Sequence, residues 1–152
     1  MTAGVIIEFG VRCLLVLLFL PFSALDKILN FQGAVGQARR AAPSRLIATG
    51  LIFAGLGVEI FMSLGVITGI ADRLAALVMA GYCMITALLW KQFWVPGDFW
   101  QRSDGLGRGL FWDFMKNFSL AGGFLLLTFG LNQASVSAFL AHPWASSQPY
   151  AR

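Results

Sequence analysis

The sequence predicts an all-α membrane protein, a four-transmembrane-helix bundle. Of the 152 residues, 58% are hydrophobic and only 12% are charged, and the mean hydropathy is +0.75. A water-soluble domain of this size could not bury so much apolar surface. Four apolar runs of about 20 residues each match a hydrocarbon core of about 30 Å, because a helix rises about 1.5 Å per residue. We assign residues 1–131 to this membrane domain.

The first apolar run predicts a helix over residues 4–23, ending near Pro21. It differs from a secretory signal because no basic residue precedes Arg12, Arg12 itself interrupts the run, and no small-residue cleavage site follows. We therefore expect a retained helix. Residues 30–45 are polar and contain Pro43, so they predict a loop or a short surface helix.

The next three apolar runs predict the remaining helices. The second helix is expected at residues 46–67 and the third at residues 74–94, with a tight turn around Gly69 between them. The fourth helix is expected at residues 109–131. Together with the first helix they make a compact quartet.

Two segments lie outside these helices. Residues 94–108 are rich in Trp, Pro, Gly and charge, and the flanking indoles are typical of an aromatic belt at one membrane interface. This loop is also long enough to contact a partner protein. Residues 132–152 alternate small and polar side chains and contain two prolines, which predicts a surface or disordered tail.

The distribution of basic residues indicates membrane topology rather than nucleic-acid binding. The formal charge is +4 and the isoelectric point is about 9.6, but the basic residues gather in short loops beside apolar helices. The bilayer is therefore the expected partner, and no nucleic acid is. By the positive-inside rule, both termini lie outside the cytoplasm. The loops after the first and third helices hold Lys27, Arg39, Arg40, Arg45, Lys91, Arg102 and Arg108, whereas the opposite side holds Arg73 and Arg152.

Ionisable side chains inside the apolar runs mark a candidate site, since a charge near the bilayer centre costs about 3 kcal/mol. Counting residues along each helix places Arg12 about 18 Å and Glu59 about 20 Å from the inner face. This predicts an Arg12–Glu59 pair. Glu8 lies one helical turn from Arg12 on the same helix face and adds a second carboxylate.

A second polar layer is expected nearer the cytoplasm. Asp113, Lys116 and Asn117 share one face of the fourth helix, and Asp26 and Lys27 come near the same depth.

Two interpretations of these layers stay open. They are either salt bridges that fix helix register, or one of them binds a polar head group, such as a quinone carbonyl, or relays protons. No metal site is expected, because Cys13 and Cys83 have neither a CxxC motif nor a neighbouring histidine. His142 is the sole histidine, which excludes bis-histidine haem ligation within this chain.

Several stretches together resemble the DoxX family of small four-helix membrane proteins. They are the run from Arg12 to Pro21, SALDKILNFQGAVGQAR, GVEIFMSLGVITGIADRLAAL around Glu59, and FWDFMKNFSLAGGFLLL around Lys116. The resemblance covers residues from about 5 to 130 and implies a multi-pass protein of the bacterial cytoplasmic membrane associated with oxidoreductase systems. The family's polar elements fall on Arg12, Lys27, Glu59, Lys116 and Asn117, with no agreed catalytic set to transfer.

The resemblance implies an accessory or anchoring membrane subunit of a quinone-linked oxidoreductase or respiratory complex, with other membrane or redox subunits as partners. No cofactor is expected on this chain alone, but quinone is a candidate ligand, with Arg12 donating to a carbonyl and Glu59 carrying a proton. The alternatives are a stand-alone quinone-interacting membrane oxidoreductase and an oligomeric small-solute transporter. These hypotheses differ on whether the chain is itself an enzyme.

Overall fold

The computed structural model describes residues 2–101 and 105–151, and all regular secondary structure in these ranges is helical. Arg102 and Arg152, which entered the count of basic residues, lie outside them. The orientation of the termini therefore stays a prediction.

The first membrane span is longer than expected and is broken in the middle. Helix α1 (Ala3–Val16) is followed by a kinked segment, η1 (Leu18–Ser23), which leads into α2 (Ala24–Leu29). The break lies at Leu20, with φ −122° and ψ 113°, directly before Pro21. A proline pushes the residue before it out of the helical region, so the sequence itself causes the break.

The second span contains a π-helical turn. After the short helix α3 (Phe31–Ala38), helix α4 (Arg45–Gly57) passes through the π-helical turn η2 (Val58–Met62) into α5 (Ser63–Thr68). Single π turns inside α-helices often occur at functional sites, and this one carries Glu59. The span ends at Gly69, whose φ of 80° suits a residue without a Cβ.

The last three helices complete the fold. They are α6 (Asp72–Trp90), α7 (Leu106–Phe129) and α8 (Gln133–Ala141). Helices α7 and α8 are bent by 78° relative to each other. Gly130 lies at the bend with a φ of 68°. The segment expected to be a surface or disordered tail thus contains a helix.

Length and composition give three spans outright, at Ala3–Leu29, Arg45–Thr68 and Asp72–Trp90. Helix α7 qualifies as a fourth only when it is taken together with α8, because charged residues in its first half lower its hydropathy. The described residues therefore hold three or four candidate membrane spans. This result confirms the predicted all-α membrane fold.

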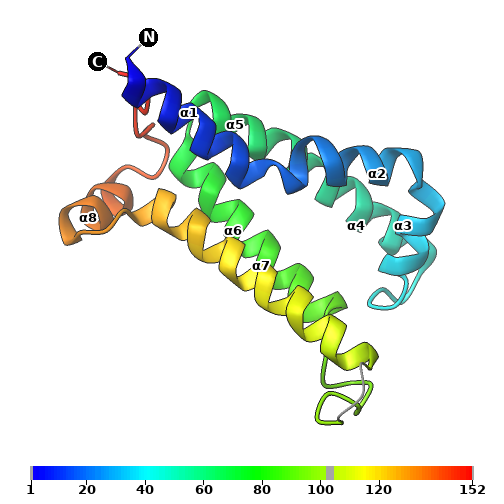
Figure 1. The fold of residues 1–152 in the computed structure, drawn as a ribbon. Coiled ribbons are helices and arrows are strands. Elements are labelled where there is room, and N and C mark those ends of the chain that lie inside the picture. The colour runs from blue at the N-terminus through cyan, green and yellow to red at the C-terminus, as the bar shows by residue number, and fades with distance from the viewer. Residues whose placement is uncertain (1, 102–104, 152) are drawn as a thin grey trace.

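The helices form two arms that diverge from a common core, as Figure 1 shows. One arm consists of α2, α3 and α4, and the other consists of α6 and α7 side by side. The core lies where the arms meet, and small residues such as Ala76 and Ala80 let the helices approach closely there. It is built around Val16, Phe19, Val66, Met79 and Phe124.

The outer surface of the spans is apolar, as contact with lipid requires. Large hydrophobic side chains point outward from each of the first three spans, among them Ile7, Leu14, Phe53, Phe61 and Ile85. The chain is therefore a multi-pass membrane protein.

Candidate functional site

Glu59 lies at the centre of a buried polar group, here called the Glu59 cluster, formed with Ser23, Lys27 and Tyr82. Glu59 is only 1% exposed. Its Oε1 atom accepts hydrogen bonds from Lys27 Nζ at 2.6 Å, from Ser23 Oγ at 2.9 Å and from the Tyr82 hydroxyl at 2.9 Å. The kinked segment η1 and the π-helical turn η2 bring this group together, since Ser23 ends η1 and Glu59 lies in η2.

The second carboxylate oxygen of Glu59 has a different environment. Among the described residues, Oε2 is buried and has no hydrogen-bond partner, and the same holds for the indole Nε1 of Trp90 and the hydroxyl of Ser63. Buried polar atoms without partners are rare, because each costs about 1–3 kcal/mol of lost hydration. Such atoms are candidates for hydrogen bonds to another molecule where they lie beside a cavity, which Ser63 does not.

Glu59 and Trp90 both line a cavity of about 630 Å³ between the two arms. The apolar part of its wall includes Phe19, Leu51 and Leu120, and the polar part includes the Glu59 cluster. Most small-molecule sites have volumes of about 300–1,000 Å³ and combine an apolar wall with a few polar groups. The cavity is of this kind.

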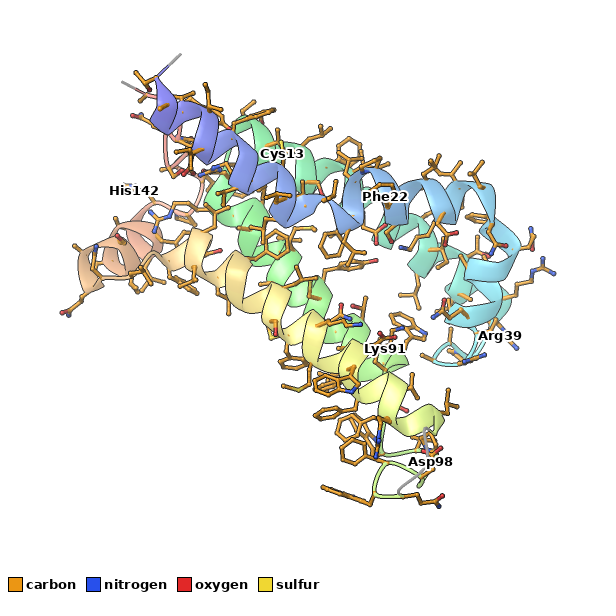
Figure 2. All side chains as sticks on the ribbon, in the orientation of Figure 1. Cys13, Phe22, Arg39, Lys91, Asp98 and His142 are labelled. Atoms are coloured by element: carbon orange, nitrogen blue, oxygen red, sulfur yellow. The ribbon has the colours of Figure 1, made fainter. Side chains whose placement is uncertain are left out.

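Charged side chains form a rim around the same cavity. Lys91 Nζ lies 2.9 Å from Asp113 Oδ2, and Lys116 Nζ lies 3.7 Å from Asp113 Oδ1. Asn117 donates to the backbone oxygen of Asp113 at 2.9 Å. Asp26 lines the cavity from the opposite arm. Figure 2 shows Lys91 on the α6–α7 arm, on the side that faces α3 and α4.

A second buried polar group, the Arg12 cluster, lies at the other end of the first span. Arg12 is 2% exposed and Asp72 is fully buried. Arg12 Nε bonds Glu8 at 2.7 Å, and Nη1 bonds Asp72 Oδ2 at 2.7 Å and the Val66 carbonyl at 2.8 Å. Its Nη2 donates to Ser147 Oγ at 3.1 Å. All three guanidinium nitrogens are thus paired.

The segment after α8 covers this cluster. The Ser147 amide donates to Asp72 Oδ1 at 2.8 Å, and the Ser147 hydroxyl donates to Asp72 Oδ2. The Tyr150 hydroxyl donates to the carbonyl of Ile67. Burial raises the pKa of Tyr150, so its hydroxyl remains a donor at neutral pH. These contacts help to bury Arg12 and Asp72, whereas the Glu8 side chain stays 42% exposed.

The predicted Arg12–Glu59 pair is wrong. Arg12 pairs with Asp72 and Glu8, whereas Glu59 pairs with Lys27. The first span extends to Leu29 instead of residue 23, so Lys27 lies inside the span and not beyond its end. Lys27 consequently meets Glu59, and Arg12 meets the start of α6.

The candidate residues therefore divide among three places. Glu8 and Arg12 belong to the Arg12 cluster, Lys27 and Glu59 to the Glu59 cluster, and the other four, which are Asp26, Asp113, Lys116 and Asn117, to the rim. Lys91, which was not a candidate, joins them in the rim. Lys27 was expected in the same layer as Asp113 but lies in the Glu59 cluster.

Several residues of these sites were not candidates in the sequence, among them Ser23 of the Glu59 cluster and Lys91 of the rim. Asp72 was interpreted as part of a tight turn, yet it begins α6 and is completely buried. Tyr82 and Trp90 lie on a helix without a periodic polar signal, and Ser147 lies in the segment expected to be a tail. Within the part of the chain that the structure describes, no group of His, Cys, Asp and Glu side chains could hold a metal ion.

Part of the chain matches a known protein family. A family model described as DoxX matches residues 8–92, a region that contains both clusters except for Ser147. No curated protein and no solved structure matches the chain.

Proposed function

The chain belongs to the DoxX family, and we propose that it is a membrane subunit of a quinone-linked oxidoreductase that binds the ring of a quinol in the Glu59 cavity. In this role the chain binds and orients the quinol and accepts a proton from it, and a partner subunit holds the redox centre. The observation that supports it is the pair of unpartnered buried atoms, Glu59 Oε2 and Trp90 Nε1, on residues lining one cavity.

The chemistry of these two atoms selects the class of ligand. A carboxylate oxygen can only accept a hydrogen bond, and an indole N–H can only donate one. The ligand must therefore carry a hydroxyl group and a second oxygen that accepts. A hydroquinone ring has two hydroxyl groups and meets both requirements, whereas the oxidised quinone has no hydroxyl to offer Glu59. The site favours the reduced form.

The remaining groups fit the same task. Lys27, at 2.6 Å from Glu59, balances the carboxylate charge, and Phe19 contributes an apolar wall for the ring. When the hydroquinone gives two electrons to the oxidant on the partner subunit, it becomes a quinone and loses two protons. The hydroxyl that bonds Glu59 Oε2 releases one proton to that carboxylate, and the other hydroxyl releases its proton toward the rim carboxylates. The rim carboxylates of Asp26 and Asp113 lie at the same cavity, where a proton can leave toward water.

The test compares a tailless hydroquinone with its oxidised quinone, using calorimetric titration of the purified protein in nanodiscs under anaerobic conditions. We expect the hydroquinone to bind at least about tenfold more tightly, since a hydrogen bond to a charged group contributes about 1.5–3 kcal/mol. Glu59→Gln should remove this preference, because an amide can donate to a quinone carbonyl as well as accept.

The matched control is Glu8→Gln, which makes the same substitution in the Arg12 cluster. Glu8 does not line the cavity, so the preference for the reduced ring should survive. Failure of both ring forms to bind, or equal binding of both, would contradict the proposal.

A second candidate function is supported by the aromatic surface beside the rim. Trp100 is 90% exposed and Trp112 is 58% exposed, and indoles are enriched where proteins dock as well as at membrane interfaces. In this role the chain only stabilises a larger membrane complex. Its deletion should then lower the amount of intact complex without changing the activity per complex.

A further inference from the structure

A shallow apolar groove runs along the outside of the molecule between the first span and α7. Its wall consists of Leu15 and Leu18 on one side and of Trp112, Met115, Lys116, Ser119 and Leu120 on the other, and its volume is about 580 Å³. Leu18, Trp112 and Met115 each expose about half of their side-chain surface. The groove therefore opens toward the lipid, not toward the protein core.

The groove is continuous with the Glu59 cavity. Leu18, Lys116 and Leu120 line both spaces. At the other end the two helices touch, because a Cβ placed on Gly123 would lie 3.1 Å from Leu15 Cδ1. The groove is thus closed toward α8 and open toward the cavity.

Resting on the proposed function, we propose that this groove holds the apolar chain of a polyprenyl hydroquinone whose ring lies in the Glu59 cavity. The ligand enters sideways from the bilayer between η1 and α7. Continuity between the polar cavity and the apolar groove requires one molecule with a polar ring at one end and a long hydrocarbon chain at the other. A small water-soluble phenol would use only the cavity.

Lys116 fits this arrangement at the junction of the two spaces. Its long apolar stem can line the passage while its ammonium group stays beside Asp113, 3.7 Å away. At the junction the methylene groups of Lys116 can therefore contact the hydrocarbon chain of the ligand, while its ammonium group remains part of the charged rim.

The experiment blocks the groove and leaves the cavity unchanged. Ser119 lines the groove and not the cavity. Ser119→Trp should therefore fill the space that the hydrocarbon chain of the ligand would occupy. In nanodiscs, with ligand concentrations expressed per lipid, we expect this variant to bind a long-chain hydroquinone about tenfold more weakly or worse, by overpacking. Binding of the tailless hydroquinone should stay within about twofold of the native value.

The matched control is Leu126→Trp, which enlarges another lipid-facing residue of α7 outside the groove. This variant should bind both ligands as the native protein does. If Ser119→Trp weakens the binding of neither ligand, or weakens the binding of both equally, the groove does not hold the hydrocarbon chain of the ligand. If the native protein binds neither ligand, the proposed function itself has failed.

Photolabelling gives a second measurement that does not depend on a variant. A hydroquinone with a diazirine on its first isoprenoid unit should label the peptides containing Leu18 and Met115, and excess unlabelled long-chain hydroquinone should suppress the labelling. Labelling spread over other lipid-facing residues, such as Phe53, would overturn the assignment, since it would indicate only a hydrocarbon chain dissolved in the bilayer.

Discussion

The Arg12 cluster and the Glu59 cluster both remove a charged side chain almost completely from solvent, yet they differ in how fully it is paired. All three nitrogens of the Arg12 guanidinium have partners, and the segment around Ser147 covers them. One oxygen of Glu59 has three donors and the other has none among the described residues. This difference supports the proposal that the second cluster binds a ligand, whereas the first holds the helices together.

This distinction makes opposite predictions for stability and for binding. Changes in the Arg12 cluster should lower the free energy of unfolding and leave hydroquinone affinity unchanged. Changes at the unpartnered atoms of the cavity should lower affinity and leave stability nearly unchanged.

The largest effect is expected for Asp72→Asn. This change removes the charge that pairs with a buried guanidinium, which should cost about 3–5 kcal/mol of folding free energy. Denaturant or thermal unfolding in nanodiscs measures it. The double variant Arg12→Met/Asp72→Leu, which replaces both charges with apolar groups, should recover most of the loss. A single variant within about 1 kcal/mol of the native protein would show that Arg12 is not held mainly by Asp72.

A smaller loss of stability is expected for Lys27→Met, about 2 kcal/mol in the same assay. Glu59 then loses its cationic partner but keeps Ser23 and Tyr82 as donors, and water can enter the cavity. A loss as large as that of Asp72→Asn would mean that the Glu59 cluster is as much a part of the structural framework as the Arg12 cluster.

The covering segment can be tested with Ser147→Ala. The hydroxyl bonds both Arg12 and Asp72, but it lies at the surface, and the Ser147 amide still donates to Asp72. We expect a loss of about 1 kcal/mol in unfolding free energy and unchanged hydroquinone affinity. Ser146→Ala is a suitable control, because the Ser146 hydroxyl bonds the Gly69 carbonyl outside the cluster. A fall in affinity specific to Ser147→Ala would show that the two clusters are coupled.

The smallest change, about 0.5–1.5 kcal/mol in hydroquinone affinity, is expected for Trp90→Phe. Phenylalanine keeps an aromatic ring but lacks the indole N–H, so ligand binding should weaken about two- to tenfold. The unliganded protein should not lose stability through hydrogen bonding, since that N–H has no partner in the described structure. Trp100→Phe, on the exposed loop, serves as the control. Unchanged affinity in Trp90→Phe would remove the indole from the site.

The fold class and family could be predicted from sequence because both depend on strong local signals. Long apolar runs specify helices in a membrane, and the match to the DoxX model over residues 8–92 confirms the family. The chemical types at the candidate positions were equally visible, since Arg12, Lys27 and Glu59 stand out against apolar neighbours. Pro21 also marked the break in the first span, although the helix resumes after it.

The pairing of the charges could not be predicted, because it depends on register between spans. The first helix was expected to end at residue 23, which left Lys27 beyond it, but the span continues to Leu29 and so holds Lys27, which pairs with Glu59. The π-helical turn η2, which carries Glu59, has no clear signal in the sequence. Ser147 was missed for another reason: a polar residue in a segment of low hydropathy gives no indication that it folds back onto the first span.

The contacts of Ser147 also bear on how the protein is made. Asp72 and Ser147 are separated by 75 positions along the chain, and Arg12 and Ser147 by 135. During synthesis the arginine and the aspartate therefore leave the ribosome and enter the bilayer well before the serine exists. The Arg12–Asp72 ion pair must therefore persist at first without its bonds to Ser147. The segment that contains Ser147 adds these bonds last, after the helices before it have been made.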